Sequence, residues 1–374
     1  TLIFGLFLFI SRVREEVSAQ PLDQWWNDSW RYRVKIEVNS SFVNRTNWIV
    51  EQKINFTQLL EERGDSGTFD LNSIRVVEYN SSGYPLYEVP SQFDKDENFN
   101  ASTNAYGTLV FLMNGTTQAN EKRIFYLYFD VIEDGGKEAP NYPSQLNYSW
   151  DGEEVHVNTS SLRIYIDTNR GNYTSGIYRV VKVTGETIIN EPTGTGRTIE
   201  YLEYSNGTHN FTFDLRNNAS ITEGAVRIVI EQKGEEVVFG NPNLKTGKFK
   251  IRKRYYIYER AGPNEQGSYL KIEQQLIPLT QTYRNSTPAG ALALDLERGI
   301  FGGISSTNEN NTDPYSWVLA AGPSAETVGI INLKEINTSN YFAIYRSDAG
   351  RIGIELNGTT ISQPIYERAL VYFG

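Results

Sequence analysis

The sequence predicts an all-β fold of tandem antiparallel β-sandwiches, with a smaller sandwich first and a larger one after it. Apolar and polar residues alternate with period two along much of the chain, as in strands with one buried face. β-Branched and aromatic residues fill these runs, and Gly, Asn, Asp or Pro separates most of them. No window sustains the 3.6-residue period of a helix. These patterns favour packed sheets over helical or α/β folds.

Each expected element follows from its own stretch of sequence. One short helix is expected at residues 56–63, because Gly64 follows the segment directly and is suited to end it. The expected strands, in chain order, are residues 32–38, 73–79, 108–113, 123–131, 162–167, 225–231, 248–258, 269–277 and 353–356.

One break in the strand pattern divides the chain. Residues 134–146 contain two Gly and two Pro without apolar alternation, which is typical of a linker. We therefore expect an N-terminal β-sandwich at residues 23–133 and a large β-sandwich at residues 147–374. Because residues 369–374 still follow a strand pattern, we expect the second sandwich to be truncated at its C-terminus.

Composition excludes several classes of function. The 374 residues carry a net charge of −10, whereas a nucleic-acid binder needs a basic face to meet phosphates. The chain has no Cys, which excludes thiol catalysis, zinc–thiolate sites, iron–sulfur clusters and disulfides. Two histidines, His156 and His209, leave little room for a histidine-built metal site or a serine-type triad. We expect no metal, no cofactor and no nucleic-acid partner.

The first 22 residues form a segment of their own. An apolar run of nine residues, from Leu2 to Ile10, is too short to span a bilayer, which takes about 20. The run suits a secretory signal peptide, with small residues before a cleavage position after Ala19. Charges such as Arg12 and Glu15 fit that interpretation badly. The alternative is a retained assembly segment, either a pilin-like core helix or a strand donated to a neighbouring subunit.

Asparagine-linked glycosylation is the strongest chemical signal in the sequence. The acceptor pattern Asn-x-Ser/Thr, with x not Pro, occurs seventeen times, whereas composition alone predicts roughly five occurrences. Asn, Ser and Thr also gather in turns, but such clustering hardly triples the count. The predicted acceptors are Asn27, Asn39, Asn44, Asn55, Asn80, Asn100, Asn114, Asn147, Asn158, Asn172, Asn206, Asn210, Asn218, Asn285, Asn310, Asn337 and Asn357.

This acceptor density predicts where the protein resides. A glycan is bulky and hydrophilic, so an asparagine that carries one must face solvent. We therefore expect a secreted protein, outside the cell or at its surface, that relies on its cores and glycans for stability. The absence of Cys and the single Met also remove oxidisable residues. Together these features favour an archaeal cell surface.

A series of motifs in the first sandwich carries a family resemblance. In chain order they are residues 30–34 (WRYRV), 54–60 (INFTQLL), 73–78 (SIRVVE), 89–94 (VPSQFD), 107–111 (GTLVF), 115–117 (GTT) and 125–129 (FYLYF). This order resembles a β-sandwich module of unassigned function in archaeal and bacterial surface proteins. It also resembles the N-terminal sandwich of exo-acting rhamnogalacturonan lyase-like proteins. The resemblance covers residues 25–133.

The second sandwich carries a further resemblance, in residues 162–167, 223–227, 254–258 and 270–273. These runs are similar to the large supersandwich of polysaccharide lyases and galactose-mutarotase-like proteins. Enzymes of that kind usually add a helical region that bears the catalytic residues, and this sequence contains no such region. Because a fold alone does not give a function, the resemblance does not by itself imply catalysis.

Aromatic and acidic groups offer candidate sites, each with a structural alternative. Trp25, Trp26 and Trp30 could stack on sugar rings, or could pin the first strand onto the core. Residues 94–98 (DKDEN) and 167–171 (DTNRG) have oxygen ligands at the spacing of calcium loops. The first stretch lacks the Gly that such a loop needs at its sixth position, so a solvated acidic loop is the alternative. A plain turn is the alternative for the second.

Other titratable residues offer weaker candidates. Glu223 with Glu231 or Glu273 could form the carboxylate pair of a glycosidase, although a chain with 45 acidic residues holds many such pairs by chance. Neither His156 nor His209 stands beside an obvious partner in the sequence. We assign no catalytic residue.

The stretch 248–254 (KFKIRKR) concentrates positive charge on one strand. Alternation places its four cations on one face, where an acidic polysaccharide, an acidic surface of another subunit or solvent alone could meet them. These cations are Lys248, Lys250, Arg252 and Arg254.

Two functional hypotheses follow. The first is a secreted, heavily N-glycosylated structural or adhesive cell-surface protein, such as a surface-layer, sheath or filament subunit. It would associate with itself or with other surface proteins through strand edges. The second is a polysaccharide-active, lyase-like enzyme or its non-catalytic carbohydrate-binding part.

Overall fold

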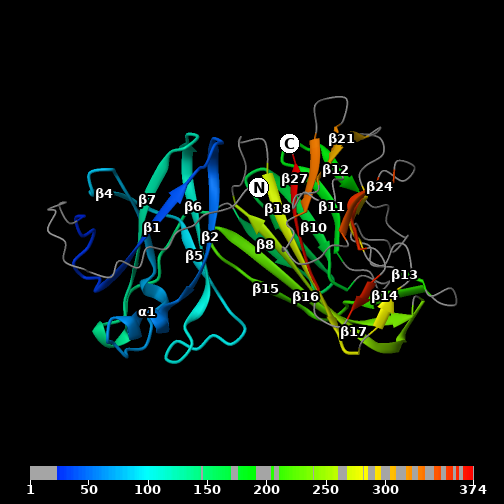
Figure 1. Ribbon diagram of the computed structural model, residues 1–374, viewed down its shortest axis with the longest axis horizontal. Coiled ribbons are helices and arrows are strands. Elements are labelled where there is room, and N and C mark those ends of the chain that lie inside the picture. The colour runs from blue at the N-terminus through cyan, green and yellow to red at the C-terminus, as the bar shows by residue number, and fades with distance from the viewer. Residues whose placement is uncertain are drawn as a thin grey trace.

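The computed structural model of the chain has the all-β class that the sequence predicts (Figure 1). It describes residues 23–144, 146–169, 176–190, 204–205, 210–238, 240–259 and 268–280, and nine further strands between residues 282 and 373. The predicted N-terminal segment, residues 1–22, lies outside these described residues. None of the helices that the structure describes has the length and apolar character needed to cross a membrane.

Two antiparallel sheets form the first sandwich, with strand orders β1-β7-β3-β4 and β2-β6-β5. Alternate side chains of both sheets point inward and meet in one apolar core. The rings of Phe56 and Phe69 stack at its centre with centroids 4.0 Å apart. The strands are β1 (Tyr32–Asn39), β2 (Arg45–Asn55), β3 (Arg75–Tyr79), β4 (Pro85–Val89), β5 (Ser91–Lys95), β6 (Tyr106–Thr117) and β7 (Lys122–Phe129).

The predicted short helix is present as α1 (Phe56–Glu62). The side chain of Asn55 caps it by accepting a hydrogen bond from the backbone N–H of Gln58. Beyond the helix, Gly64 adopts a positive φ of 74°, which a residue with a Cβ disfavours. Two 3₁₀ turns, η1 (Leu71–Ser73) and η2 (Ile132–Asp134), complete the helical segments of this region.

The second sandwich packs a five-stranded sheet, in the order β12-β11-β10-β9-β8, against a ten-stranded sheet. The strands of the smaller sheet are β8 (Asn147–Trp150), β9 (Glu154–Asn158), β10 (Leu162–Asp167), β11 (Gly176–Lys182) and β12 (Thr187–Asn190). The strands of the larger sheet are β13 (Tyr204–Ser205), β14 (Asn210–Asp214), β15 (Ala219–Thr222), β16 (Arg227–Val238), β17 (Asn241–Tyr258), β18 (Ser268–Pro278), β21 (Ile304–Asn308), β22 (Trp317–Ala321), β23 (Thr327–Asn332) and β27 (Ile365–Phe373).

Five remaining strands form two small sheets, paired as β19-β26 and β20-β25-β24. Their bounds are β19 (Thr282–Arg284), β20 (Ala291–Asp295), β24 (Tyr341–Arg346), β25 (Arg351–Leu356) and β26 (Thr359–Ile361).

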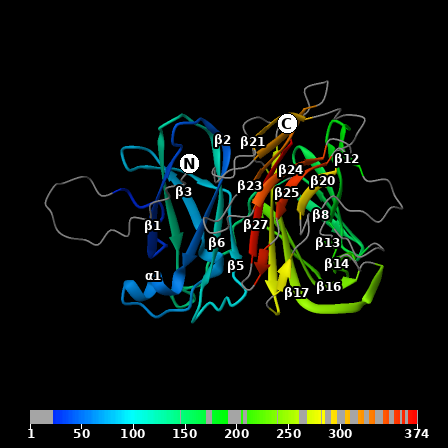
Figure 2. The same cartoon turned by 45° about the vertical axis from the view of Figure 1, so that its right-hand side comes forward.

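The Gly- and Pro-containing stretch at residues 134–146 lies between the two cores and is fastened to the first sandwich. The backbone N–H of Lys137 donates to Asp70 over 2.7 Å, and Arg75 donates to the carbonyl of Glu138 over 2.7 Å. The hydroxyl of Tyr142 donates to Glu88 over 2.6 Å. The two sandwiches lie side by side in both views of the ribbon (Figures 1 and 2).

Candidate functional site

The acceptor asparagines of the described residues lie mainly in turns and at strand ends. Ten of the seventeen have described side chains, and none of these ten is buried. The exposed ones are Asn39, Asn44, Asn100, Asn114, Asn147 and Asn218, and the half-buried ones are Asn27, Asn55, Asn80 and Asn158. The side chains of the other seven predicted acceptors, Asn172, Asn206, Asn210, Asn285, Asn310, Asn337 and Asn357, lie outside the described residues.

Local hydrogen bonds explain why these asparagines sit in turns. The side-chain oxygens of Asn39, Asn80 and Asn100 each accept from a backbone N–H two residues further on. Such bonds let a short polar side chain hold a turn in place of a backbone bond. The bonds use the amide oxygen, whereas a glycan attaches to the amide nitrogen. The turn geometry of these acceptors is therefore compatible with modification.

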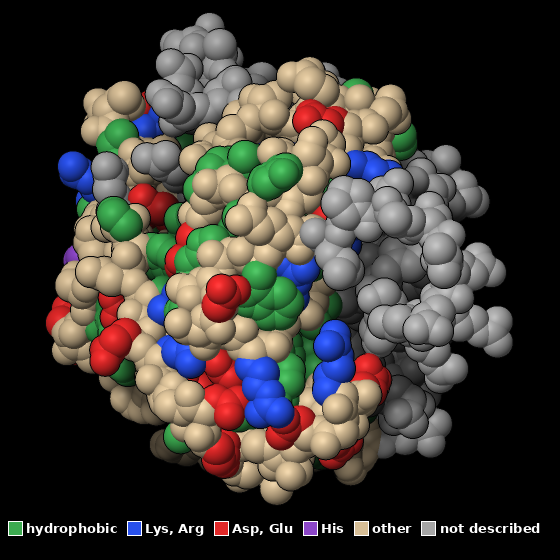
Figure 3. Space-filling view, turned by 90° about the vertical axis from the view of Figure 1, so that its left-hand side faces the viewer, with side chains coloured by type: hydrophobic (Ala, Val, Ile, Leu, Met, Phe, Trp, Pro, Cys, Tyr) green, Lys and Arg blue, Asp and Glu red, His purple; other side chains and the backbone are tan. Residues whose placement is uncertain are grey.

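Acceptors stand at both ends of the first sandwich. Asn39 lies opposite Lys122 at one end, and the side chain of Asn44 accepts from the backbone of Ala119 at the same end. Asn55 and Asn100 lie at the other end, around α1 and the β5–β6 loop. The outer face between these ends carries intermixed acidic and basic side chains with hydrophobic groups among them (Figure 3).

The three tryptophans hold the segment before β1 against the outer face of the first sandwich. The indole N–H of Trp30 donates to the carbonyl of Ser73 over 2.6 Å, and the indole N–H of Trp25 donates to the carbonyl of Trp30 over 3.0 Å. The rings of Trp25 and Trp26 each lie 5.5 Å from the ring of Tyr128. The pinning interpretation therefore fits the structure, but the contact is with the outer face of the sheet and not with the inner core.

Polar contacts also hold the segment before β1 against the sheet. The guanidinium of Arg33 lies between the rings of Trp25 and Tyr126, 4.3 and 4.4 Å from their centroids. The backbone N–H of Gln24 donates to the carbonyl of Gly83 over 2.8 Å. A Cβ at Gly83 would lie 2.3 Å from the carboxylate of Asp23, so glycine is required where the segment crosses the β3–β4 turn.

The acidic stretch 94–98 is partly solvated, as one interpretation expects, because Lys95, Glu97 and Asn98 are exposed, while cations of the protein pair with Asp94 and Glu97. Asp94 accepts from Arg227 over 2.5 Å and from the side chain of Gln92 over 2.7 Å. Glu97 lies 3.1 Å from Arg252. Across the described residues, no group of three or more His, Asp or Glu side chains is arranged to hold a metal ion.

The second calcium candidate, residues 167–171, begins as a plain turn. Asp167 accepts from the backbone N–H of Asn169 over 3.0 Å, and Thr168 is buried. Residues 170 and 171 lie outside the described residues.

Arg227 is the centre of an ion network that joins the two sandwiches. Its side chain is 2% exposed, and one guanidinium nitrogen lies 2.6 Å from the carboxylate of Glu51 in β2. Lys271 of β18 lies 2.6 Å from the other oxygen of that carboxylate. The hydroxyl of Tyr258 donates to the same Glu51 oxygen that Arg227 contacts. Burial alone would raise the pKa of Glu51, but Lys271 and Arg227 lower it to about 2. Glu51 is therefore ionised at neutral pH.

An apolar contact lies beside this network. Ile49, Val110 and Leu112 of the first sandwich pack against Val226, Tyr256 and Tyr258 of the second. The side-chain oxygen of Gln92 completes the junction by accepting from the backbone N–H groups of Val226 and Arg227, each over 2.8 Å. The junction thus combines an apolar centre with buried, satisfied charges, which fixes how the two sandwiches meet.

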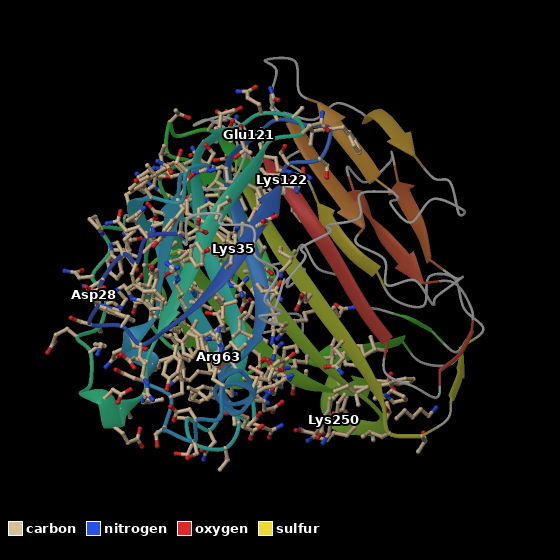
Figure 4. All side chains as sticks on the ribbon, turned by 60° about the vertical axis from the view of Figure 1, so that its left-hand side comes forward. Asp28, Lys35, Arg63, Glu121, Lys122 and Lys250 are labelled. Atoms are coloured by element: carbon tan, nitrogen blue, oxygen red, sulfur yellow. The ribbon has the colours of Figure 1, made fainter. Side chains whose placement is uncertain are left out.

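Two of the four cations on the basic strand face at residues 248–254, Arg252 and Arg254, pair with an acidic side chain of the protein. Glu231 accepts from Arg252 over 2.5 Å and from Arg254 over 2.6 Å. Burial favours a raised pKa for Glu231, but these two arginines lower it to about 2. Lys248 and Lys250 are exposed, and Figure 4 shows Lys250 near the lower end of the large sheet.

The proposed carboxylate pairs do not have the character of a glycosidase site. Glu231 and Glu273 flank Arg254 in one cross-strand row, while Glu223 is exposed. Glu273 accepts from the hydroxyl of Tyr256 over 2.6 Å. A glycosidase acid needs a raised pKa to hold its proton, whereas the pKa of Glu231 is lowered.

One pairing that the sequence analysis missed involves His156. Its Nε2 lies 3.0 Å from the carboxylate of Glu154, two residues earlier on the same strand face. The hydroxyl of Tyr178 donates to the same carboxylate over 2.8 Å, and the ring of Tyr165 lies 4.6 Å from the imidazole. The two-residue spacing of Glu154 and His156 on an expected strand could have predicted this pair, because residues i and i+2 share one face. His209 lies outside the described residues.

Comparisons by sequence and by structure give different results for this chain. No protein-family model matches the sequence, and no curated protein matches it. Among solved structures, the chain is similar to an α-mannosidase from Enterococcus faecalis V583, with a TM-score of 0.49 and 9% sequence identity. The likeness covers 93% of this chain and 43% of that chain, so the present chain spans less than half the length of that enzyme.

Proposed function

We propose that this chain belongs to a secreted, N-glycosylated structural or adhesive protein of an archaeal cell surface, such as a subunit of a surface layer, sheath or filament. The observation that carries the proposal is the acceptor pattern, which exceeds the chance expectation about threefold. Every acceptor side chain of the described part is exposed or half-buried, as a glycan requires. The motifs at residues 25–133 that resemble a surface-protein module support the same proposal.

The junction supports a structural role. A charged network around Arg227 and the apolar contact beside it couple the two sandwiches into one unit. A subunit of a lattice or fibre gains from such coupling, because these contacts pass a load on one sandwich directly to the next.

Glycopeptide mass spectrometry of native material tests the glycosylation claim. We expect glycan on most of the six exposed acceptors, and none on Asn120 and Asn217, which are equally exposed but lack the acceptor pattern. Glycan on fewer than a handful of all seventeen acceptors would contradict the proposal.

Assembly is the second part of the proposal, and a strand edge supports it. β4 is the last strand of its sheet, and Leu86 and Tyr87 on it are 51% and 47% exposed. A second copy could pair with this edge strand. Negative-stain microscopy of native material should show ordered lattices or fibres, and Leu86→Lys should reduce them while Lys122→Gln on β7 should not. Monodisperse particles in native material would contradict this part.

A polysaccharide-active protein is the second candidate, and it rests on the lyase-like resemblance. Its test is incubation with pectic and other acidic polysaccharides, followed by ultraviolet absorbance of unsaturated products. The absence of product across a broad panel excludes lyase activity of this chain.

A further inference from the structure

The outer face of the five-stranded sheet carries an aromatic and basic surface directly beside two acceptor asparagines. Residues that pair across neighbouring strands share one face of a sheet. One outward row contains Asn147, Asn158 and Arg163, from β8, β9 and β10. The next row contains Ser149, His156, Tyr165 and Arg179, from β8 to β11. Diagonal neighbours in such rows lie about 7–8 Å apart.

The aromatic row is held in place by contacts among its own members. The ring of Tyr165 lies 4.6 Å from the imidazole of His156 and 6.0 Å from the ring of Tyr178. The guanidinium of Arg179 lies 5.2 Å from the centroid of Tyr165. Glu154 fixes the positions of His156 and Tyr178 through its carboxylate. We call Tyr165, His156 and Arg179 the platform.

The two acceptors beside the platform are not equivalent. Asn147 and Asn158 are direct cross-strand partners, and the side-chain nitrogen of Asn158 donates to the oxygen of Asn147 over 2.9 Å. A glycan attaches through the nitrogen, and this bond engages that atom of Asn158. Asn147 is exposed on the edge strand, whereas Asn158 is half-buried. Two glycans on directly opposite residues would also collide.

We infer that Asn147 carries the glycan of this pair, and that its first sugars fold back across the sheet and pack on the platform. The inference rests on the proposed glycosylation and adds to it which acceptor is used and what the sugar contacts. Asn147 lies diagonally next to His156, and Tyr165 on β10 is the direct cross-strand partner of His156. One or two sugar rings therefore suffice to reach from the attachment point to the tyrosine ring.

The chemistry of the platform suits a pyranose. The C–H groups on one face of a sugar ring carry partial positive charge and pack on the negative face of an aromatic ring. Sugar hydroxyls are hydrogen-bond acceptors for the exposed guanidinium groups of Arg163 and Arg179. A glycan bound in this way would shield the β9–β10 pairing from solvent and stabilise the folded chain.

A double-mutant cycle on the full chain, made in a host that glycosylates it, tests the inference. Ser149→Ala removes the acceptor pattern and keeps the Asn147 side chain, and Tyr165→Thr removes the platform ring but retains strand propensity. We expect Ser149→Ala to lower the Tm of the wild type by about 2–4 °C and to have little effect in the Tyr165→Thr background. Ser220→Ala, which removes the exposed acceptor at Asn218, is the matched control and should act equally in both backgrounds.

Each outcome of the experiment is decisive. Glycopeptide mass spectrometry should find glycan on Asn147 and not on Asn158, and hydrogen exchange of β9 and β10 should be faster in Ser149→Ala. A glycan on Asn147 whose removal acts equally with and without Tyr165 overturns the inference and leaves the proposed function standing. So does glycan on other acceptors but not on Asn147. Absence of glycan from every acceptor overturns the proposed function as well.

Discussion

The guanidinium of Arg227 lies 2.6 Å from the carboxylate of Glu51, although the two residues are 176 positions apart and belong to different sandwiches. The same side chain also reaches Asp94, and it is 2% exposed. A buried charge of this kind is tolerated only where partners satisfy it. The charges of Arg227, Glu51 and Asp94 are therefore paired only when the two sandwiches are docked.

Replacement of Arg227 should uncouple the sandwiches. In Arg227→Met, the carboxylates of Glu51 and Asp94 lose their shared partner, and we expect a loss of about 3–5 kcal/mol in the free energy of unfolding. Calorimetry should then resolve two transitions in place of one. Arg216→Met, which breaks the more exposed pair with Asp214, is the control and should cost at most about 1 kcal/mol. An unchanged single transition in Arg227→Met would show that the apolar contact alone couples the sandwiches.

Acid should weaken the junction through Glu51. Its pKa is about 2 in the folded protein, below the ordinary value of 4.5 that applies when the chain unfolds. The stabilisation is therefore complete above about pH 4.5 and is lost as the pH falls through about 2, because the unfolded chain binds the proton first. Glu51→Gln should lower stability at pH 7 by on the order of 2 kcal/mol and flatten the decline below pH 5. Denaturant titrations from pH 7 to pH 2 measure both effects, and parallel curves for the two proteins would refute this account.

A glycine next to the junction lies in close contact with the side chain of Gln92. A Cβ at Gly224 would lie 2.3 Å from the side-chain amide of Gln92, which accepts from the backbone N–H groups of Val226 and Arg227. Gly224→Ala should displace Gln92 and leave these two donors unsatisfied, at a cost of about 1–3 kcal/mol in unfolding free energy. Gly136→Ala is the matched control, because a Cβ there would meet nothing within 4 Å. Equal stability of the two variants would mean that Gln92 is dispensable.

Elements with a local signal in the sequence are predicted correctly. Alternation along residues 162–167 predicts β10 with the bounds that the structure has, and Gly64 marks the end of the helix at 56–63 within one residue. These predictions need only neighbours in the chain, because burial of one strand face leaves a period-two pattern.

The junction could not be predicted in the same way. Arg227 and Asp94 are 133 residues apart, and no local pattern says which loop meets which strand. The acidic stretch 94–98 and the basic stretch 248–254 were each visible as separate charge clusters. The sequence does not contain the docking geometry that places Glu97 3.1 Å from Arg252, so that members of the two stretches pair with each other.

The tryptophan segment should act in stability and not in sugar binding. Trp30→Ala removes a half-buried ring and leaves the carbonyl of Ser73 without its indole partner, so we expect a loss of about 2–4 kcal/mol and increased binding of a hydrophobic dye. Phe42→Ala, at a site that is 66% exposed, should change stability by less than about 0.5 kcal/mol. Should Trp30→Ala keep its stability but lose retention on a saccharide array, the sugar-stacking interpretation would be the correct one.

Substitutions at Asn55 can separate its two roles, as the N-cap of α1 and as a predicted glycan acceptor. Its oxygen caps α1 through the N–H of Gln58 at 3.2 Å, and the same residue is a predicted acceptor. Asn55→Asp keeps a capping oxygen and removes the acceptor, whereas Asn55→Ala removes both. If the cap is the main contribution, Asn55→Ala should cost about 0.5–2 kcal/mol and Asn55→Asp close to nothing, because aspartate caps a helix as well as asparagine does. Unfolding curves of glycosylated protein that fall equally for both variants would instead assign the stabilisation to the sugar.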